Sequence, residues 1–332
     1  DDTEHEIEAA LERPSHPPER IGRVRQFHGA LEDYLRELHT RFAGLDLAGT
    51  RIVLDCANGA TFRAAPEIFR RLGADVDALA DQPDGRNINA GCGSTHIELL
   101  AEQMAAGQYD VGFAFDGDGD RVLAVDRAGR VVDGDELIAL AALRLREQGR
   151  LPGEGVVVTV MTNYGFHRAM EAAGIQVATT AVGDRYVLDE LRQRGWALGG
   201  EQSGHIIDLG FGPSGDGIAS ALLALEALHG RDLSERDAMD KLPQQLINVR
   251  APDRAAIKST MESPAVLESI EKEQQLLTGR GRVLVRASGT EPLIRVMVEA
   301  PAEDETEAVC GRLVAVIERS VGVAGVGGAA DQ

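Results

Sequence analysis

Segments typical of buried strands alternate with segments typical of amphipathic helices between residues 51 and 230, and this alternation constrains the fold most strongly. The first half predicts strands at 51–60, 74–80 and 109–115, and helices at 61–73 and 95–107. The second half predicts helices at 134–149, 165–174, 184–195 and 215–230, and strands at 155–162, 175–182 and 196–204. Alternation of this kind predicts α/β domains built on parallel pairing.

The pattern changes after residue 243. Two β-type runs, 282–288 and 293–301, follow a strand at 245–252 and a helix-rich middle, and a closing helix is expected through Arg319. The predicted class is therefore α/β, with consecutive α/β domains on mixed sheets followed by a smaller α+β C-terminal domain. The expected parts are 1–43 (a linker, poorly ordered to about residue 24, and a helix from 27 to 42), 44–133 (metal-binding), 134–243 (sugar-binding), 244–320 (phosphate-binding) and 321–332 (a flexible tail).

Composition excludes several classes of partner. The 332 residues carry a formal charge of −20, which argues against nucleic acid and anionic membranes as partners. The acidic start is unlike a signal peptide, and no run approaches ~18 apolar residues. Three separated cysteines favour reduced thiols in the cytoplasm over a redox or zinc role. Because the first residue is Asp, we expect a processed chain or part of a longer protein.

A loop with the sequence DGDGDR, residues 116–121, follows the third expected strand. Asp116, Asp118 and Asp120 repel one another unless a cation or heavy solvation compensates. The calcium loop of EF-hands would need Gly in place of Arg121 and Glu in place of Arg127, so that pattern fails. The loop predicts a Mg²⁺ site, with Arg121 binding the oxygens of a phosphate, against the simpler interpretation of a solvated Asp-Gly turn.

A second polar cluster lies in GGEQSGH, residues 199–205. In an extended chain Glu201, Ser203 and His205 would share one face. A carboxylate, a hydroxyl and an imidazole together suit the hydroxyls of a sugar, although a polar strand edge would look the same.

A third cluster, RASGTEPLIR at 286–295, holds Arg286, Ser288, Thr290 and Arg295 around a turn that contains glycine. Two guanidiniums, two hydroxyls and free backbone N–H groups predict an anion-binding site, although a decorated hairpin turn remains an alternative. The three clusters together predict a protein that holds a phosphosugar by its phosphate while phosphoryl chemistry happens at its other end.

These motifs, in this order and spacing, resemble the α-D-phosphohexomutase superfamily. The sequences CANGAT, PDGRNINAGCGSTH and AVGDRYVLDEL are most similar to its bacterial phosphoglucosamine mutase branch. The resemblance covers nearly the whole chain. It implies that the three aspartates hold Mg²⁺ and that Glu201, Ser203 and His205 form the sugar-binding loop. The implied site also includes residues that bind the non-reacting phosphate and a second loop that faces the sugar: Arg286, Ser288, Gly289, Thr290 and Arg295, and Gly183, Asp184 and Arg185.

The implied reaction interconverts glucosamine 6-phosphate and glucosamine 1-phosphate, on the route to UDP-N-acetylglucosamine and the bacterial cell wall. A phosphoserine gives its phosphoryl group to the sugar, and glucosamine 1,6-bisphosphate serves as intermediate and activator. The family carries that serine in an A-S-H-N-P loop of a first domain, and this motif does not occur among the 332 residues. Ser15, in a proline-rich stretch, is not taken as the nucleophile, so we expect the chain alone to be inactive.

Three other functions stay open. A phosphomannomutase or phosphoglucomutase of the same superfamily would differ in the sugar 2-substituent that it reads. A non-catalytic phosphosugar-binding protein and a Mg²⁺-dependent phosphatase with an aspartate nucleophile are the others, and the phosphatase leaves two clusters unexplained. A homodimer is compatible with the motifs, which do not predict the quaternary state or any regulation by phosphorylation.

Overall fold

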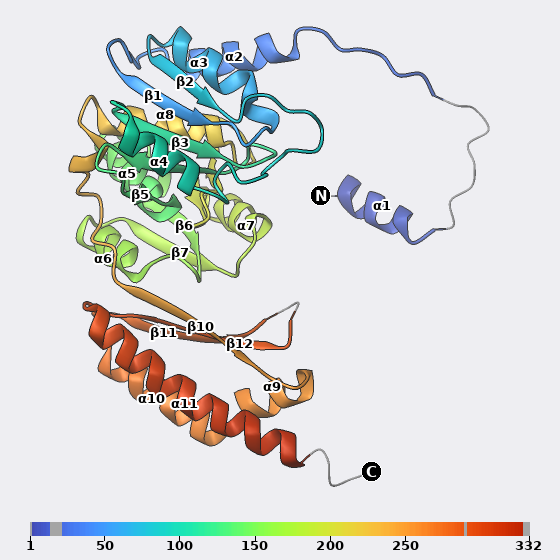
Figure 1. Cartoon of the computed structure of the whole chain (residues 1–332), viewed down its shortest axis with the longest axis vertical. Helices are drawn as coiled ribbons and strands as arrows, with labels where there is room; N and C mark the ends of the chain where they lie inside the picture. The colour runs from blue at the N-terminus through green and yellow to red at the C-terminus, as the bar shows by residue number, and fades with distance from the viewer. Residues whose placement is uncertain (1, 14–21, 289–290, 328–332) are drawn as a thin grey trace.

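The computed structural model describes residues 2–13, 22–288 and 291–327. Within these residues the strands form three sheets, and Figure 1 shows them stacked along the long axis of the molecule. The first sheet has the order β2-β1-β3-β4-β5. Its strands are β1 (Arg51–Asp55), β2 (Asp75–Leu79), β3 (Val111–Phe115), β4 (Val122–Asp126) and β5 (Val131–Val132). The pairing among β2, β1 and β3 is parallel, whereas β4 and β5 add antiparallel, so the sheet is mixed.

The second sheet has the order β7-β6-β8-β9 and is also mixed. Its strands are β6 (Gly155–Thr159), β7 (Gln176–Thr180), β8 (Leu198–Gly200) and β9 (Ile206–Asp208). Both β7 and β8 run parallel to β6, and β9 runs antiparallel to β8. The predicted alternation of strands and helices is therefore present in both α/β domains.

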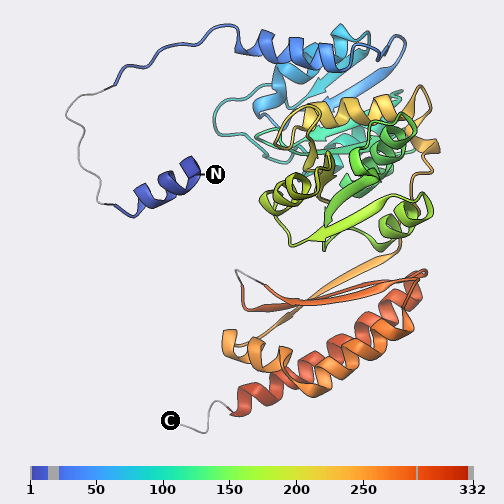
Figure 2. The same ribbon diagram turned by 180° about the vertical axis from the view of Figure 1, so that it is seen from behind.

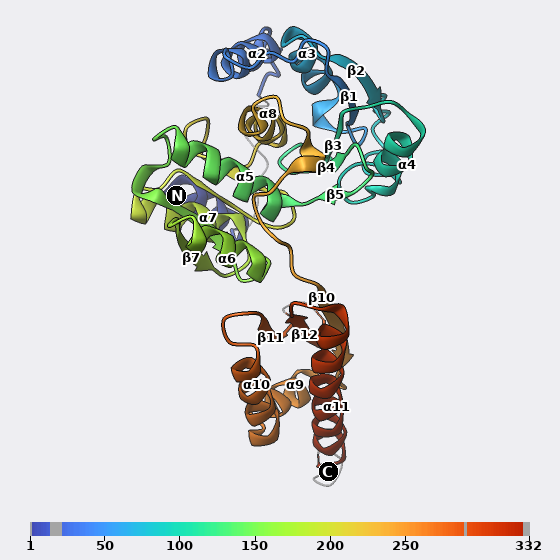
Figure 3. The same cartoon turned by 90° about the vertical axis from the view of Figure 1, so that its left-hand side faces the viewer.

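Helices cover these two sheets and join them. They are α2 (Ala30–Arg41), α3 (Ala64–Arg71), α4 (Glu98–Ala106), α5 (Gly134–Glu147), α6 (Tyr164–Ala172), α7 (Asp184–Arg194) and α8 (Gly217–Leu228), with short 3₁₀ turns at Ala60–Phe62, Pro152–Glu154 and Leu233–Glu235. Figure 3 shows α5 and α8 between the two sheets. Both helices are buried over most of their length, and one continuous apolar core includes Phe113 of the first sheet, Leu222 of α8 and Val156 of the second sheet. The two α/β domains therefore share a core and are held rigidly together.

The C-terminal domain has its own sheet and core. Its strands, in the antiparallel order β10-β12-β11, are β10 (Gln244–Arg250), β11 (Arg282–Ala287) and β12 (Leu293–Glu299). Its helices are α9 (Arg254–Met261), α10 (Pro264–Leu276) and α11 (Glu303–Gly327). Figure 2 shows α10 and α11 on the face of this sheet that lies away from the α/β domains. The predicted class, α/β domains followed by an α+β domain, is confirmed.

The two ends of the chain contain more helix than expected. Asp2–Leu11 form a helix, α1, although the stretch to about residue 24 was expected to be a poorly ordered linker. At the other end α11 continues past Arg319 to Gly327. The buried side chains of Leu313, Ile317 and Val321 recur every four residues, which extends the helical apolar stripe into the expected tail. Ser15 lies outside the described residues.

Candidate functional site

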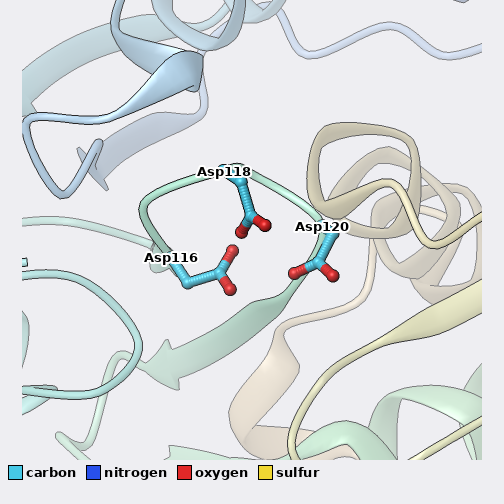
Figure 4. Close-up of side chains that lie close together, drawn as sticks. All are labelled: Asp116, Asp118 and Asp120. Atoms are coloured by element: carbon cyan, nitrogen blue, oxygen red, sulfur yellow. The ribbon is translucent and has the colours of Figure 1, made fainter. Parts of the chain in front are cut away.

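The three aspartates lie in the loop that connects the antiparallel neighbours β3 and β4, and Figure 4 shows their carboxylates turned toward one another. One oxygen from each lies within 4.8 Å of the others. Asp116 is buried, Asp120 is half-buried and Asp118 is exposed. Glycine permits the close approach of the neighbouring loop, because a Cβ on Gly59 would lie 2.2 Å from the carbonyl oxygen of Gly117. The predicted metal residues are therefore brought together.

The charge of this loop is only partly compensated within the chain. Burial raises the pKa of Asp116, and the neighbouring Asp120 raises it further. The Arg121 Nε lies 3.7 Å from oxygens of both carboxylates. Among the described residues, Oδ1 of Asp120 is buried without a hydrogen-bond donor. Oxygen donors only, with one buried oxygen unpaired, fit a hard divalent cation such as Mg²⁺.

His205 supports this loop from the side. Its Nδ1 lies 3.0 Å from Oδ2 of Asp120, and its Nε2 accepts a hydrogen bond from the Gly215 N–H at 3.2 Å. Because Nε2 accepts, the proton is on Nδ1, which donates to the carboxylate. His205 is 4% exposed, and both ring nitrogens have partners within the chain. The structure therefore gives His205 a role in orienting Asp120, and its contact with a sugar stays a prediction.

The expectation that Glu201, Ser203 and His205 share one face of an extended strand was wrong. Strand β8 ends at Gly200, and a tight turn follows in which the Gly204 N–H donates to the Glu201 carbonyl. Gly204 has φ +93°, and a Cβ there would lie 2.1 Å from the Val122 carbonyl oxygen, so the turn packs directly on β4. The turn separates His205, which contacts the metal loop, from Glu201 and Ser203.

Glu201 organises the second predicted sugar loop. Its carboxylate accepts the Gly183 N–H at 2.9 Å and the Ser203 hydroxyl at 3.3 Å. Gly183 has φ +136° and immediately precedes α7. Asp184 and Arg185 follow it at the start of that helix and are exposed. One carboxylate therefore joins the two loops that the resemblance assigns to the sugar.

A pocket of about 630 Å³ lies beside these loops and brings Arg121, Glu201 and Ser203 together. Its walls also include polar residues that the sequence interpretation did not select: Ser94, Thr95, Asp133, Thr159, Gln202, Lys241 and Gln244. The Lys241 ammonium is paired with the Asp133 carboxylate. Ser94 and Thr95 lie in the motif PDGRNINAGCGSTH, which indicated the family but no particular binding residue. Lys241 gave no signal, because a lone lysine in a loop is usually a solvated charge.

The third cluster lies on the C-terminal sheet, where Arg286 of β11 and Arg295 of β12 stand directly opposite each other. Among the described residues neither guanidinium has a carboxylate partner, and Nε of Arg295 is buried without a hydrogen-bond partner. Burial and the charge of Arg295 lower the pKa of Arg286. Like charges placed opposite one another destabilise a sheet, so this pair fits an anion that is bound between them.

The rest of that cluster is only partly placed. The Ser288 hydroxyl accepts a hydrogen bond from the Glu291 N–H at 3.3 Å. Gly289 and Thr290 lie outside the described residues, so their predicted part in phosphate binding stays a prediction. Arg286 Nη2 lies 3.8 Å from the sulfur of Met161, which lines the pocket described above. We call Arg286, Ser288 and Arg295 the anion anchor, and the anchor borders the pocket.

Comparison with known families places all three clusters in one architecture. Residues 32–129 and 133–246 match the families described as phosphoglucomutase/phosphomannomutase alpha/beta/alpha domains II and III. Residues 246–316 match the C-terminal domain of the same enzymes. The chain belongs to the α-D-phosphohexomutase superfamily. The aspartate loop at 116–121 lies in the region that matches domain II, and the turn at 201–204 lies in the region that matches domain III. The anion anchor lies in the region that matches the C-terminal domain.

Curated relatives of this phosphohexomutase chain are phosphoglucosamine mutases. The protein from Moorella thermoacetica is 51% identical over 321 residues, which are 94% of this chain and 71% of the relative. The one from Bacillus licheniformis is 44% identical over 330 residues, 97% of this chain and 73% of the relative. The one from Pelotomaculum thermopropionicum is 50% identical over 302 residues, 90% of this chain and 67% of the relative.

Two solved structures have the same fold. N-acetylphosphoglucosamine mutase of Aspergillus fumigatus, in complex with GlcNAc-6P and magnesium, gives a TM-score of 0.73 at 22% identity, over 90% of this chain and 67% of that one. A phosphoglucomutase/phosphomannomutase family protein of Burkholderia thailandensis gives 0.72 at 19% identity, over 96% and 69%. Within the described residues, no helix of the chain is long and apolar enough to cross a membrane.

Proposed function

We propose that this chain supplies the metal loop, the sugar pocket and the anion anchor of a phosphoglucosamine mutase. The enzyme would interconvert glucosamine 6-phosphate and glucosamine 1-phosphate in the cytoplasm, where the three buried, free cysteines stay reduced. The observation that carries the proposal is the approach of three separate clusters to one pocket. Arg121 and Glu201 line it from the two α/β domains, and Arg286 touches Met161 at its edge.

Residues of this chain would bind both ends of the phosphosugar. The anchor guanidiniums, Arg286 and Arg295, bind the non-reacting phosphate through charge-assisted hydrogen bonds. Glu201, held by Gly183 and Ser203, accepts hydrogen bonds from sugar hydroxyls, and Arg121 neutralises oxygens of the phosphoryl group at the reacting end.

Mg²⁺ would be held by Asp116, Asp118 and Asp120, and when bound it supplies positive charge next to the phosphoryl group. His205 keeps the Asp120 carboxylate turned toward this position. The proposed route passes through glucosamine 1,6-bisphosphate, which needs two phosphate positions and a sugar that binds in either orientation. The anchor and the aspartate loop provide the two positions.

The 332 residues contain no A-S-H-N-P loop, and we propose that by themselves they bind the phosphosugar but do not convert it. A titration of the chain with glucosamine 6-phosphate and with glucose 6-phosphate, in the presence of Mg²⁺, tests the substrate class. Tighter binding of the amino sugar supports the phosphoglucosamine mutase. Tighter binding of the 2-hydroxy sugar would favour a phosphomannomutase or phosphoglucomutase, and no binding of either would contradict the proposal.

A further inference from the structure

The α/β domains meet the C-terminal domain at a buried ion pair. Glu299, the last residue of β12, is fully buried and stands directly opposite Arg282, the first residue of β11. The Arg282 Nε donates to the Glu299 carboxylate at 2.8 Å. The same carboxylate accepts the backbone N–H of Tyr164 at 2.7 Å. Tyr164 is the first residue of α6, so the pair reaches from one domain into the other.

Arg282 crosses the same boundary with its remaining donors. Its two Nη atoms donate to the carbonyl oxygens of Val160 at 2.9 Å and Thr162 at 2.5 Å, just after β6. A buried ion pair is stable only when its hydrogen-bonding groups are satisfied in a good geometry. Because these donors and acceptors come from both domains, the pair connects the two domains at this point.

The segment that connects the two domains is also fixed. The Asn163 side chain donates to the Leu242 carbonyl and accepts the Leu242 N–H, both at 3.0 Å. A Cβ on Gly165 would lie 2.0 Å from the Asp240 carbonyl oxygen, so the connection packs directly on the start of α6. We call Asn163, Arg282 and Glu299 the junction cluster.

The junction cluster lies at the near end of the strand that carries the anchor. Arg286 is four residues beyond Arg282 on β11, and at a rise of about 3.3 Å per residue the two are separated by roughly 13 Å. A rotation of about 10° at the cluster would therefore move the anchor by ~2 Å relative to the pocket. Displacements of about 1 Å in a binding geometry are enough to impair catalysis severely.

We propose that the junction cluster is a set of positioning residues that fixes the spacing between the anion anchor and the sugar pocket. A phosphosugar must span that spacing, whereas inorganic phosphate, measured without Mg²⁺, occupies a single phosphate position and spans nothing. This inference rests on the proposed function, since it concerns how a phosphosugar binds. It predicts that loosening the cluster weakens the binding of glucosamine 6-phosphate selectively.

The first test breaks the contact between the Tyr164 backbone and the Glu299 carboxylate. Proline is well tolerated at the first position of a helix, and Asn163 already has the extended backbone that suits a residue before proline. Tyr164→Pro therefore replaces the N–H that binds Glu299 with a ring carbon that crowds the carboxylate. Tyr164→Ala is the matched control, because it also loses the aromatic ring but keeps the N–H. For the proline variant we expect a three- to tenfold loss in glucosamine 6-phosphate affinity, with inorganic phosphate affinity within twofold of that of the alanine control.

The second test removes the charge of Glu299. Glu299→Gln leaves the Arg282 guanidinium without a negatively charged partner. We expect the affinity for glucosamine 6-phosphate to fall tenfold or more, without a matching fall in the affinity for inorganic phosphate. The control is Glu273→Gln, which breaks the pair between Glu273 and Arg312 inside the C-terminal domain. Circular dichroism melting shows whether each variant is folded.

Three results would overturn the inference. Equal losses for both ligands would mean that the cluster supports the anchor itself, and unchanged affinities would mean that it positions nothing. Failure of both Tyr164→Pro and Glu299→Gln to melt cooperatively would assign the cluster to folding alone. If the chain without substitutions binds glucosamine 6-phosphate no more tightly than inorganic phosphate, the proposed function is contradicted, and not the inference about the junction cluster.

Discussion

Replacing Arg286 with methionine removes one charge of the anchor but keeps most of the apolar stem beside Met161. A charge-assisted hydrogen bond contributes about 1.5–3 kcal/mol, and we expect a loss of about 2–3 kcal/mol in phosphosugar binding. That loss corresponds to roughly 30- to 150-fold in Kd. The free energy of unfolding of the empty chain should stay the same or rise by less than about 1 kcal/mol, because Arg295 no longer faces a like charge.

The assay is isothermal titration with glucosamine 6-phosphate, alongside urea unfolding without ligand. Arg280→Met is the matched control, since Arg280 lies in the same domain and pairs with Glu305 at the surface. Mg²⁺ affinity should not change in either variant, because the aspartate loop belongs to another domain. A variant that loses stability while its phosphosugar affinity is unchanged would refute the role of Arg286 as an anion ligand, and so would a parallel loss of Mg²⁺ binding.

Three further predictions concern charge elsewhere in the chain. Asp118→Asn should abolish the thermal shift produced by Mg²⁺ without lowering the stability of the empty chain, because the Asp118 side chain is exposed and its neighbours repel it; a destabilised variant with a normal shift would make the loop structural. Burial, with a contribution from Arg282, lowers the pKa of His167 to about 4, so the unfolded chain takes up that proton first as the pH falls. Stability should therefore decrease between about pH 6.5 and 4 by up to ~3 kcal/mol, and His167→Gln should flatten that part of the curve; an unchanged slope in urea titrations would contradict it. Burial and the nearby Asp133 raise the pKa of Asp135 to about 7. Between about pH 4 and 7 the folded chain keeps a proton on Asp135 that the unfolded chain has lost, so the free energy of unfolding decreases as the pH rises through this range. Asp135→Asn should therefore be stabilising at pH 8 but not at pH 5.

Local patterns predicted the order of strands and helices well. The loop at Asp116–Asp120 was placed correctly after a buried strand, because alternation and glycine spacing are short-range signals. The position of His205 was not predictable in the same way. Its partner Asp120 is 85 residues away, and the turn at Gly204 depends on close packing against Val122 in another domain. The alternation of polar residues at 201, 203 and 205 indicates neither the distant partner of His205 nor the packing that forms the turn.

The junction cluster and the pocket wall were missed for a similar reason. Arg282 and Glu299 have the sequence appearance of ordinary charges at strand ends, and only the register of β11 and β12 places them opposite each other. Lys241 and Asp133 are 108 residues apart, and their pairing depends on the packing of the connecting segment. Long-range pairing of charges leaves no periodic signal, whereas the anchor arginines were found because they lie on both sides of one short turn.

Formation of glucosamine 1-phosphate is the measurement that tests the central claim most directly. The coupled assay compares the 332-residue chain alone with the same chain supplied with a phosphoserine-bearing A-S-H-N-P domain, fused upstream or added in trans, in the presence of Mg²⁺ and glucosamine 1,6-bisphosphate. We predict no turnover by the chain alone, turnover when the serine domain is present, and loss of that turnover with Asp118→Asn in this chain. Sustained turnover by the chain alone that disappears with Asp118→Asn would contradict the account, as would a complete assembly that binds glucosamine 6-phosphate and never converts it.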